Sequence, residues 1–338
     1  MNILITGGAG FIGSNAAKKF ISDGHNVIIF DNLSREGVER NLKWLETFGH
    51  YEFMKGDVRN FEELTTLFAE HQFDAVLHLA GQVAVTTSVL DPRDDFENNV
   101  LGSFNLLEAV RKSGQNPVII YSSTNKVYGG MKNEKIELRN NEYVLVDYPN
   151  GINEQHGLDF HSPYGCSKGA TDQYFRDYAR IFGLRTVVFR QSCIYGYRQF
   201  GKEDQGWVAW FIIAILTGKP ITIYGDGYQV RDVLFINDLV AAYEMAIKNI
   251  DTAAGKIYNI GGGAKNAISL ARFIEILEKK MAIKLKPGRG SMRAGDQKIF
   301  ISDNSNIKNS LGWVPMVGYE EGIGLLYNWV KDNLDLFI

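Results

Sequence analysis

The chain is poor in the residues that build disulfide frameworks, flexible linkers and membrane spans. Its 338 residues include only two cysteines and seven prolines, and no apolar stretch is long enough to cross a bilayer. Two cysteines exclude a disulfide framework and fit a reducing compartment. Met1 and Asn2 lead directly into an apolar run, without the basic segment that opens a signal peptide. We therefore expect a cytoplasmic protein with no membrane insertion.

An excess of charge of one sign is also lacking. The formal net charge is −3, so we expect no nucleic-acid partner. Hydrophobic residues make up 45% of the chain and charged residues 22%, as in an ordinary globular protein. This length predicts one large domain or two closely joined domains. No metal ion is expected.

Short apolar runs alternate with helical patterns through the first half of the chain. Strands that are apolar on both faces, separated by helices, predict an α/β fold with a Rossmann-type, doubly wound parallel sheet. We assign this domain to residues 1–190, rejoined by about 234–258, and assign 191–338 mainly to a smaller C-terminal α/β lobe that binds the nucleotide sugar. The strands are expected at 3–5, 27–30, 52–54, 75–79, 118–121 and 186–189, and the helices at about 11–22, 61–70, 96–112 and 164–182.

A glycine-rich turn between the first strand and the first helix predicts a dinucleotide site. Gly7, Gly10 and Gly13 permit a tight turn and close approach of the backbone to a pyrophosphate at the helix N-terminus. Asp31 ends the second strand, where its carboxylate can accept hydrogen bonds from a ribose 2′-hydroxyl. The same carboxylate repels a 2′-phosphate, which favours NAD over NADP, although the nearby Arg35 argues the other way.

A second group of residues predicts redox chemistry. Tyr164 and Lys168 stand four residues apart on a predicted helix and share one face. Tyrosine has a pKa of about 10, which a nearby ammonium and a positive nicotinamide ring should lower. Tyr164 is then the predicted base, taking a hydroxyl proton while hydride leaves the same carbon for NAD. Thr124 follows a strand end, where its hydroxyl can bind the reacting oxygen.

Together with further motifs, these residues resemble the NAD-dependent epimerase/dehydratase family of extended short-chain dehydrogenases/reductases. The resemblance covers nearly the whole chain. The motifs that carry it, besides those above, are Asp57-Val58, His78-Leu79-Ala80, Asn99, Ser122-Ser123-Thr124, Val127-Tyr128-Gly129, Arg231-Asp232-Val233, Asn237-Asp238-Leu239 and Arg293 through Asp296.

The resemblance implies contacts for both ligands, and it implies a homodimer or homotetramer. Guanidinium groups match the oxygens of a nucleotide-sugar diphosphate, so the resemblance implies that Arg231 and Arg293 bind this diphosphate. The implied NAD contacts are Gly7, Gly10, Phe11, Ile12, Gly13, Asp31, Asn32, Asp57, Val58, Leu79, Ala80, Gly81, Gln82, Asn99, Ser122, Tyr164 and Lys168. The implied substrate contacts are Thr124, Tyr164, Gln191, Arg231 and Arg293.

The residues after Thr124 favour epimerisation over dehydration. Dehydratases of the family carry Asp-Glu there as acid and base, whereas this chain has Asn125-Lys126. The runs 78–88, 123–129 and 190–196 resemble the members that convert CDP-paratose to CDP-tyvelose through transient oxidation at C2. The same residues would serve a UDP-hexose 4-epimerase if the sugar were turned. A non-catalytic NAD-sensing protein is a distant alternative, which predicts a broken Tyr/Lys pair.

Two further features complete the expectations. Forty positions separate Thr124 from Tyr164, and the polar segment 133–161 between them is interpreted as a long loop or lid that shapes substrate selection. His78 lies on an apolar strand, so we expect it to be buried and hydrogen-bonded rather than catalytic.

Overall fold

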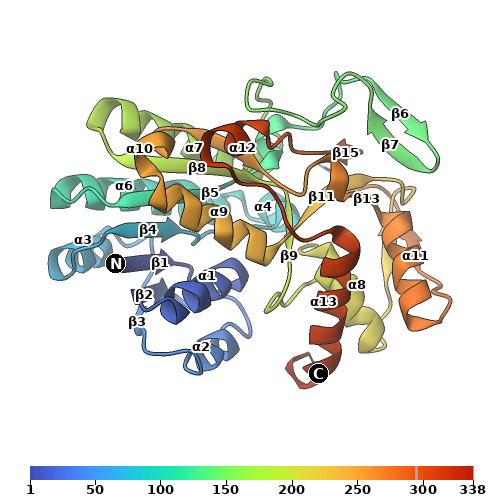
Figure 1. The fold of residues 1–338 in the computed structure, drawn as a ribbon, viewed down its shortest axis with the longest axis horizontal. Coiled ribbons are helices and arrows are strands. Elements are labelled where there is room, and N and C mark those ends of the chain that lie inside the picture. Colours follow the sequence, from blue (N-terminus) through green and yellow to red (C-terminus); the bar gives the residue numbers. More distant parts are fainter. Residues whose placement is uncertain (294–295, 338) are drawn as a thin grey trace.

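The computed structural model describes residues 1–293 and 296–337; residues 294 and 295, inside the motif from Arg293 to Asp296, lie outside the described part, as does 338. A seven-stranded parallel sheet dominates the molecule, and a smaller lobe lies at the carboxyl ends of its strands (Figure 1). The strand order β12-β8-β5-β4-β1-β2-β3 confirms the predicted Rossmann-type α/β fold. No helix among the described residues is long and apolar enough to span a membrane.

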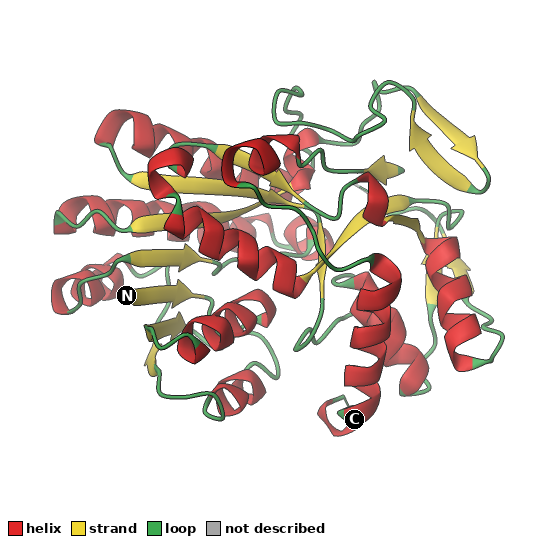
Figure 2. Ribbon diagram, viewed as in Figure 1, coloured by secondary structure: helices red, strands yellow, loops and turns green. Residues whose placement is uncertain are grey.

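The sheet is covered on both faces, as its apolar strands require (Figure 2). Its strands are β1 (Asn2–Thr6), β2 (Asn26–Asp31), β3 (Glu52–Lys55), β4 (Ala75–His78), β5 (Val118–Thr124), β8 (Arg185–Gln191) and β12 (Ile257–Ile260). The helices of this part are α1 (Phe11–Ser22), α2 (Glu39–Leu45), α3 (Phe61–Glu70), α4 (Val85–Leu90), α5 (Pro92–Phe96), η1 (Glu97–Leu101), α6 (Gly102–Ser113), η2 (Asn125–Tyr128), α7 (Ser162–Phe182), α9 (Ile236–Lys248) and α10 (Ile250–Ala253).

Alternate side chains of each strand belong to two different cores. Along β1, Ile3 and Ile5 pack in the cluster that includes α1 and α9, whereas Leu4 packs in the cluster that includes α3, α6 and α7. The helix expected at 96–112 is interrupted, because η1 is a turn of π-helix between α5 and α6. Such turns are often found at functional sites, and this one carries Asn99.

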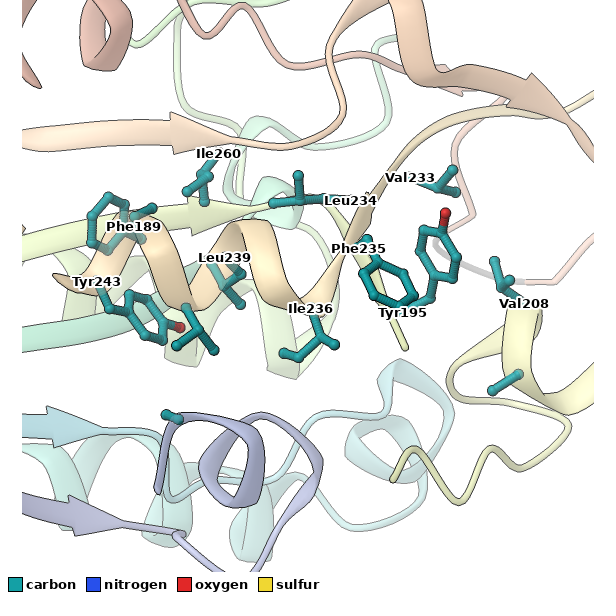
Figure 3. Close-up of a cluster of buried hydrophobic side chains, with 14 of the residues drawn as sticks. Phe189, Tyr195, Val208, Val233, Leu234, Phe235, Ile236, Leu239, Tyr243 and Ile260 are labelled. Atoms are coloured by element: carbon teal, nitrogen blue, oxygen red, sulfur yellow. The ribbon is translucent and has the colours of Figure 1, made fainter. Parts of the chain in front are cut away.

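The smaller lobe is built from short strands and three longer helices. Its elements are β9 (Cys193–Tyr195), α8 (Trp207–Leu216), β10 (Thr222–Tyr224), β11 (Val230–Phe235), η3 (Ala264–Asn266), β13 (Ala267–Ser269), α11 (Leu270–Met281), β14 (Gly288–Gly290), β15 (Ile299–Phe300), α13 (Tyr319–Asp332) and η4 (Leu334–Leu336). The helix α12 (Ser305–Leu311) packs instead on β12 and α10 of the large sheet. Figure 3 shows one apolar cluster that runs from Phe189 and Tyr243 at the sheet to Tyr195 and Val208 in the lobe. The division at 190/191 stays a proposal.

The interpretation of 133–161 as a loop was wrong in part, because the segment contains an antiparallel hairpin of β6 (Ile136–Arg139) and β7 (Glu142–Leu145). Asn140 and Asn141, between the strands, have φ values of 51° and 63°, as a tight hairpin turn requires. Farther along, Ile152 is fully buried, and its N–H donates to the Ile301 carbonyl at 2.7 Å. The segment is therefore docked on the smaller lobe.

Candidate active site

The predicted site residues gather where four neighbouring strands end. In the parallel register, Thr6 of β1 lies beside His78 of β4, and His78 lies beside Tyr121 of β5. One strand farther, Thr124 lies beside Gln191 of β8. The glycine turn, the segment 79–82 and the segment 122–124 therefore meet at one edge of the sheet, where ligands bind in this architecture.

The glycine turn has no space for a side chain at Gly7 or Gly13. A Cβ on Gly7 would lie 2.6 Å from the backbone nitrogen of Ala80, and a Cβ on Gly13 would lie 2.3 Å from the carbonyl oxygen of Gly7. Gly10 caps α1 without any side-chain hydrogen bond, so the first amide groups of the helix face outward for an anion. This cradle fits the pyrophosphate of NAD.

Asp31 is held in place by the backbone of two loops. Its carboxylate accepts hydrogen bonds from the Leu33 N–H at 2.8 Å and from the Ala9 N–H at 3.1 Å. Burial raises the pKa of Asp31, while the two backbone donors oppose that rise. Arg35 donates to Gln205 across the opening, so its guanidinium has a partner in the smaller lobe.

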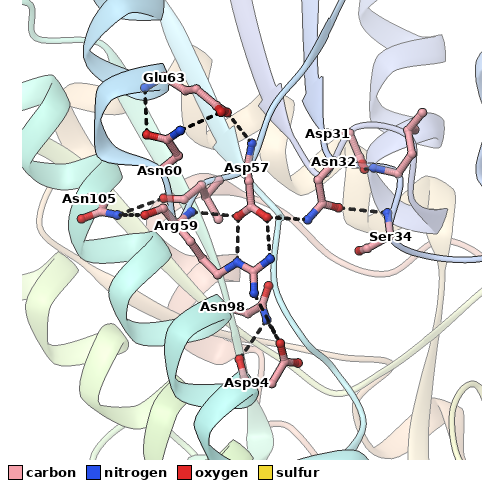
Figure 4. A network of polar contacts seen from close by, with 12 residues as sticks. Asp31, Asn32, Ser34, Asp57, Arg59, Asn60, Glu63, Asp94, Asn98 and Asn105 are labelled. Carbon is pink, nitrogen blue, oxygen red and sulfur yellow. Dashed lines mark hydrogen bonds and ion pairs between the residues drawn. The ribbon is translucent and has the colours of Figure 1, made fainter.

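A polar network beside Asp31 fixes Asp57 and Val58, two of the expected NAD contacts (Figure 4). Arg59 donates to both carboxylate oxygens of Asp57, at 3.0 and 2.7 Å, and the Asn32 amide donates at 2.9 Å. Burial would raise the pKa of Asp57, but these donors lower it to about 2. Asn105 donates to the carbonyl of Val58 at 3.1 Å. Arg59 and Asn105 were missed from the sequence, since each acts on a neighbour of the ligand site.

Replacing Asp31 with asparagine is expected to weaken NAD binding about tenfold and to narrow the preference for NAD over NADP. The substitution removes a charge-assisted acceptor worth roughly 1.5–3 kcal/mol and also removes the repulsion of a 2′-phosphate. Fluorescence titration of both dinucleotides measures the change. Glu36→Gln is the matched control, because Glu36 is a nearby exposed carboxylate paired with Lys202. Unchanged affinity for both dinucleotides in Asp31→Asn would contradict the assignment.

Tyr164, Lys168 and Thr124 come together in a buried corner, with 8%, 4% and 7% of their surfaces exposed. Thr124 acts to lower the pKa of the Tyr164 hydroxyl, and the Lys168 Nζ donates to the Ser122 carbonyl at 3.0 Å. Burial within the chain raises the pKa of Tyr164 to about 12, so its lowering stays a prediction that depends on the positive nicotinamide ring. Burial also lowers the pKa of Lys168 to about 8.

Asp95 is a site residue that the sequence did not reveal. This fully buried carboxylate accepts from the Gln82 amide at 2.9 Å and from the Asn99 amide at 3.0 Å, and it raises the pKa of Lys168 against the effect of burial. Among the described residues the buried Oδ1 of Asn99 has no partner, and a Cβ on Gly81 would lie 2.5 Å from it. Asp95 thus orients the Asn99 amide, and the Asn99 Oδ1 can accept a hydrogen bond from the dinucleotide expected there.

The other side chains expected at the substrate have partners within the chain. Arg231 is 9% exposed, and its Nη2 donates to Asp296 Oδ1 and to the Gln297 carbonyl, both at 2.6 Å. Arg293 lies over the Tyr224 ring, with its guanidinium carbon 3.9 Å from the ring centroid. Gln191 donates to the Tyr243 hydroxyl at 2.6 Å. Arg231 is therefore held in a largely buried ion pair with Asp296.

His78 has the structural role expected of it. Its ring is buried and hydrogen-bonds the Thr6 hydroxyl at 2.7 Å and the Ser103 hydroxyl at 2.8 Å. Burial lowers its pKa to about 3, so the ring is neutral. These bonds tie β4 to β1 and to α6 directly beneath the glycine turn.

Comparison with known proteins agrees with this geometry. Residues 3–261 match the NAD dependent epimerase/dehydratase family. The chain is 49% identical to CDP-paratose 2-epimerase of Salmonella typhi, over 98% of this chain and 99% of that protein. It is similar to the crystal structure of UDP-glucose 4-epimerase from Thermotoga maritima with UDP-glucose, with a TM-score of 0.85, 33% identity, and coverage of 99% of this chain and 100% of that one.

A third comparison concerns the cofactor. The Thermus thermophilus UDP-glucose 4-epimerase, solved in complex with NAD, matches with a TM-score of 0.82 and 30% identity over 98% of this chain and 100% of that one. The glycine cradle, the ribose carboxylate and the Tyr/Lys pair described above occur in a chain that matches these proteins over its full length. The chain therefore belongs to the NAD-dependent epimerase/dehydratase family, as an NAD-dependent epimerase.

Proposed function

We propose that the protein is a nucleotide-sugar epimerase that converts CDP-paratose to CDP-tyvelose by inverting C2. The observation that carries this proposal is the buried set of Tyr164, Thr124 and Lys168, with an amide and an amine at positions 125 and 126. Such a set can move one proton at a carbinol but offers no carboxylic acid there for the loss of water. The identity of 49% to a CDP-paratose 2-epimerase supports the sugar and the carbon.

Each catalytic residue has its own role at the reacting oxygen of the sugar. The Thr124 hydroxyl binds the sugar hydroxyl and holds it against Tyr164, whose pKa Thr124 acts to lower. Tyr164 Oη takes the hydroxyl proton as the ketone forms and returns it when the alcohol is restored. Bound NAD supplies the hydride acceptor and donor, together with a positive ring that favours the phenolate. Lys168, fixed by the Ser122 carbonyl, is proposed to hold the cofactor on the same face of α7 as Tyr164.

Inversion also requires the ketone to turn over between the two transfers, so its nucleotide must stay anchored. We propose Arg231 and Arg293 as the diphosphate anchors, because guanidinium groups match phosphate oxygens and both stand in the lobe that faces the sheet edge. Gln191 and the docked hairpin segment are proposed to shape the remainder of the sugar site.

Self-association is proposed through the outer face of α6 and α7. Phe104, Tyr174 and Phe182 are 37%, 44% and 47% exposed, and Phe104 packs edge-on against Tyr174 with ring centroids 5.7 Å apart. Exposed aromatic clusters of this kind mark interfaces between proteins. We propose a homodimer or a homotetramer built on this face.

The reaction is tested by giving the purified enzyme CDP-paratose in heavy water. We expect epimerisation at C2 without deuterium at that carbon, because the hydrogen leaves and returns as hydride. Proton NMR of the product measures both. Deuterium at C2 would indicate deprotonation of that carbon and contradict the mechanism. An enzyme that ignores CDP-paratose but turns over UDP-glucose would instead be a UDP-hexose 4-epimerase.

A further inference from the structure

Lys126 connects the catalytic corner to the proposed diphosphate anchor. Its backbone N–H donates to the Thr124 hydroxyl at 3.2 Å, so the residue starts at the reacting oxygen. Its ammonium Nζ lies 3.9 Å from Asp296 Oδ1, the oxygen that also accepts from Arg231 Nη2 at 2.6 Å. The side chain thus reaches from a catalytic hydroxyl to a carboxylate that holds an anion-binding arginine.

The charges around this point favour an incoming anion. The side chains of Lys126 and Arg231 are 20% and 11% exposed, so both cations are largely removed from water. Burial and the neighbouring Arg231 lower the pKa of Lys126 to about 8. Burial raises the pKa of Asp296, but Arg231 and Lys126 bring it below its ordinary value. Two partly desolvated cations sharing one carboxylate oxygen are stabilised by a second anion.

The bonding of the sugar determines where the substrate phosphate must lie relative to the catalytic residues. C2 is bonded to C1, which carries the diphosphate, whereas C4 lies on the opposite side of the ring. An enzyme that presents C2 to Tyr164 and Thr124 must therefore hold the sugar-proximal phosphate nearer to these residues than an enzyme that presents C4. A cation that begins two residues after Thr124 is in the right place for this phosphate.

We propose that Lys126 binds the sugar-proximal phosphate of the substrate and thereby selects C2, rather than C4, as the carbon that meets Tyr164 and Thr124. Lys126 is then a specificity-determining residue, and Arg231 is its partner on the same diphosphate. The inference rests on the proposed 2-epimerase function. A lysine suits this role because a flexible ammonium can follow the phosphate while the sugar ring turns over.

The binding part is tested with the NAD-loaded enzyme, by titrating CDP and CMP into wild type and Lys126→Met. CDP carries the second phosphate and CMP lacks it. We expect the substitution to weaken CDP about tenfold, as for one charged hydrogen bond, and to leave CMP unchanged. Lys126→Arg keeps the charge and should keep most of the CDP affinity. If Lys126→Met does not bind CMP, the affinities for CDP and CMP are compared in Lys126→Gln instead. Equal weakening of CDP and CMP, or of neither, would overturn the proposal.

The selection part is tested by turnover of CDP-paratose followed by NMR. Lys126→Met is expected to lower kcat/KM for C2 inversion at least about tenfold and to raise the share of the C4 epimer among the products. Lys248→Met is the matched control, because Lys248 is 64% exposed and pairs with Glu244 on α9, away from the proposed substrate site. Wild type that does not invert C2 would overturn the proposed function. An active wild type with an unchanged Lys126→Met variant would overturn the inference alone.

Discussion

Replacing Tyr164 with phenylalanine is expected to lower kcat for epimerisation by about 10²–10⁴-fold, with NAD binding largely preserved. The substitution removes only the hydroxyl that takes and returns the substrate proton. The ring remains to fill a corner in which 8% of the residue is exposed. Turnover of CDP-paratose gives kcat, and absorbance of the dinucleotide released on denaturation gives the NAD content.

The control for this variant is Tyr327→Phe, which makes the same change on α13 at a partly exposed residue outside the proposed sites and interface. It should keep the wild-type kcat. A Tyr164→Phe enzyme within tenfold of wild type would show that another group moves the proton. Loss of NAD together with turnover would show instead that the hydroxyl holds the cofactor.

The fold could be predicted because its signals are local. Apolar runs, glycine spacing and the helical spacing of Tyr164 and Lys168 each lie within one short stretch of chain, and parallel strands then bring their ends together. The hairpin in 133–161 had a local signal as well, in Asn140-Asn141 between two alternating runs, but the polarity of the segment masked it.

The rest of the site depends on partners distant in sequence. Asp95 reads as a solvated residue near a helix start, and only the fold buries it against Gln82 and Asn99. The pKa of Tyr164 was expected to fall beside an ammonium and a nicotinamide ring, and the expectation left out burial, which raises this pKa to about 12. Burial of this kind is a property of the packed molecule, so spacing alone cannot give its size.

A buried ion pair joins β8 to α7, the helix that carries Tyr164 and Lys168, and no sequence motif predicted it. Arg190 of β8 donates to both carboxylate oxygens of Asp172 on α7, at 2.8 and 3.0 Å, with 3% and 0% of their side chains exposed. Ser123, next to Thr124, donates to the same carboxylate at 2.9 Å. The Arg190 guanidinium donates in turn to the Tyr128 hydroxyl at 2.9 Å. Asp172 thereby fixes β5 and β8 against α7.

Replacing Asp172 with alanine is expected to lower the free energy of unfolding by about 3–5 kcal/mol, because it leaves the Arg190 charge buried without its carboxylate. Urea unfolding followed by circular dichroism measures the loss. Asp177→Ala, an exposed carboxylate on the same helix, should change stability by less than about 0.5 kcal/mol. A loss below about 1 kcal/mol in Asp172→Ala would mean that water or Tyr128 compensates the guanidinium. Since Ser123 adjoins Thr124, the folded variant should also turn over more slowly, whereas Asp177→Ala should not.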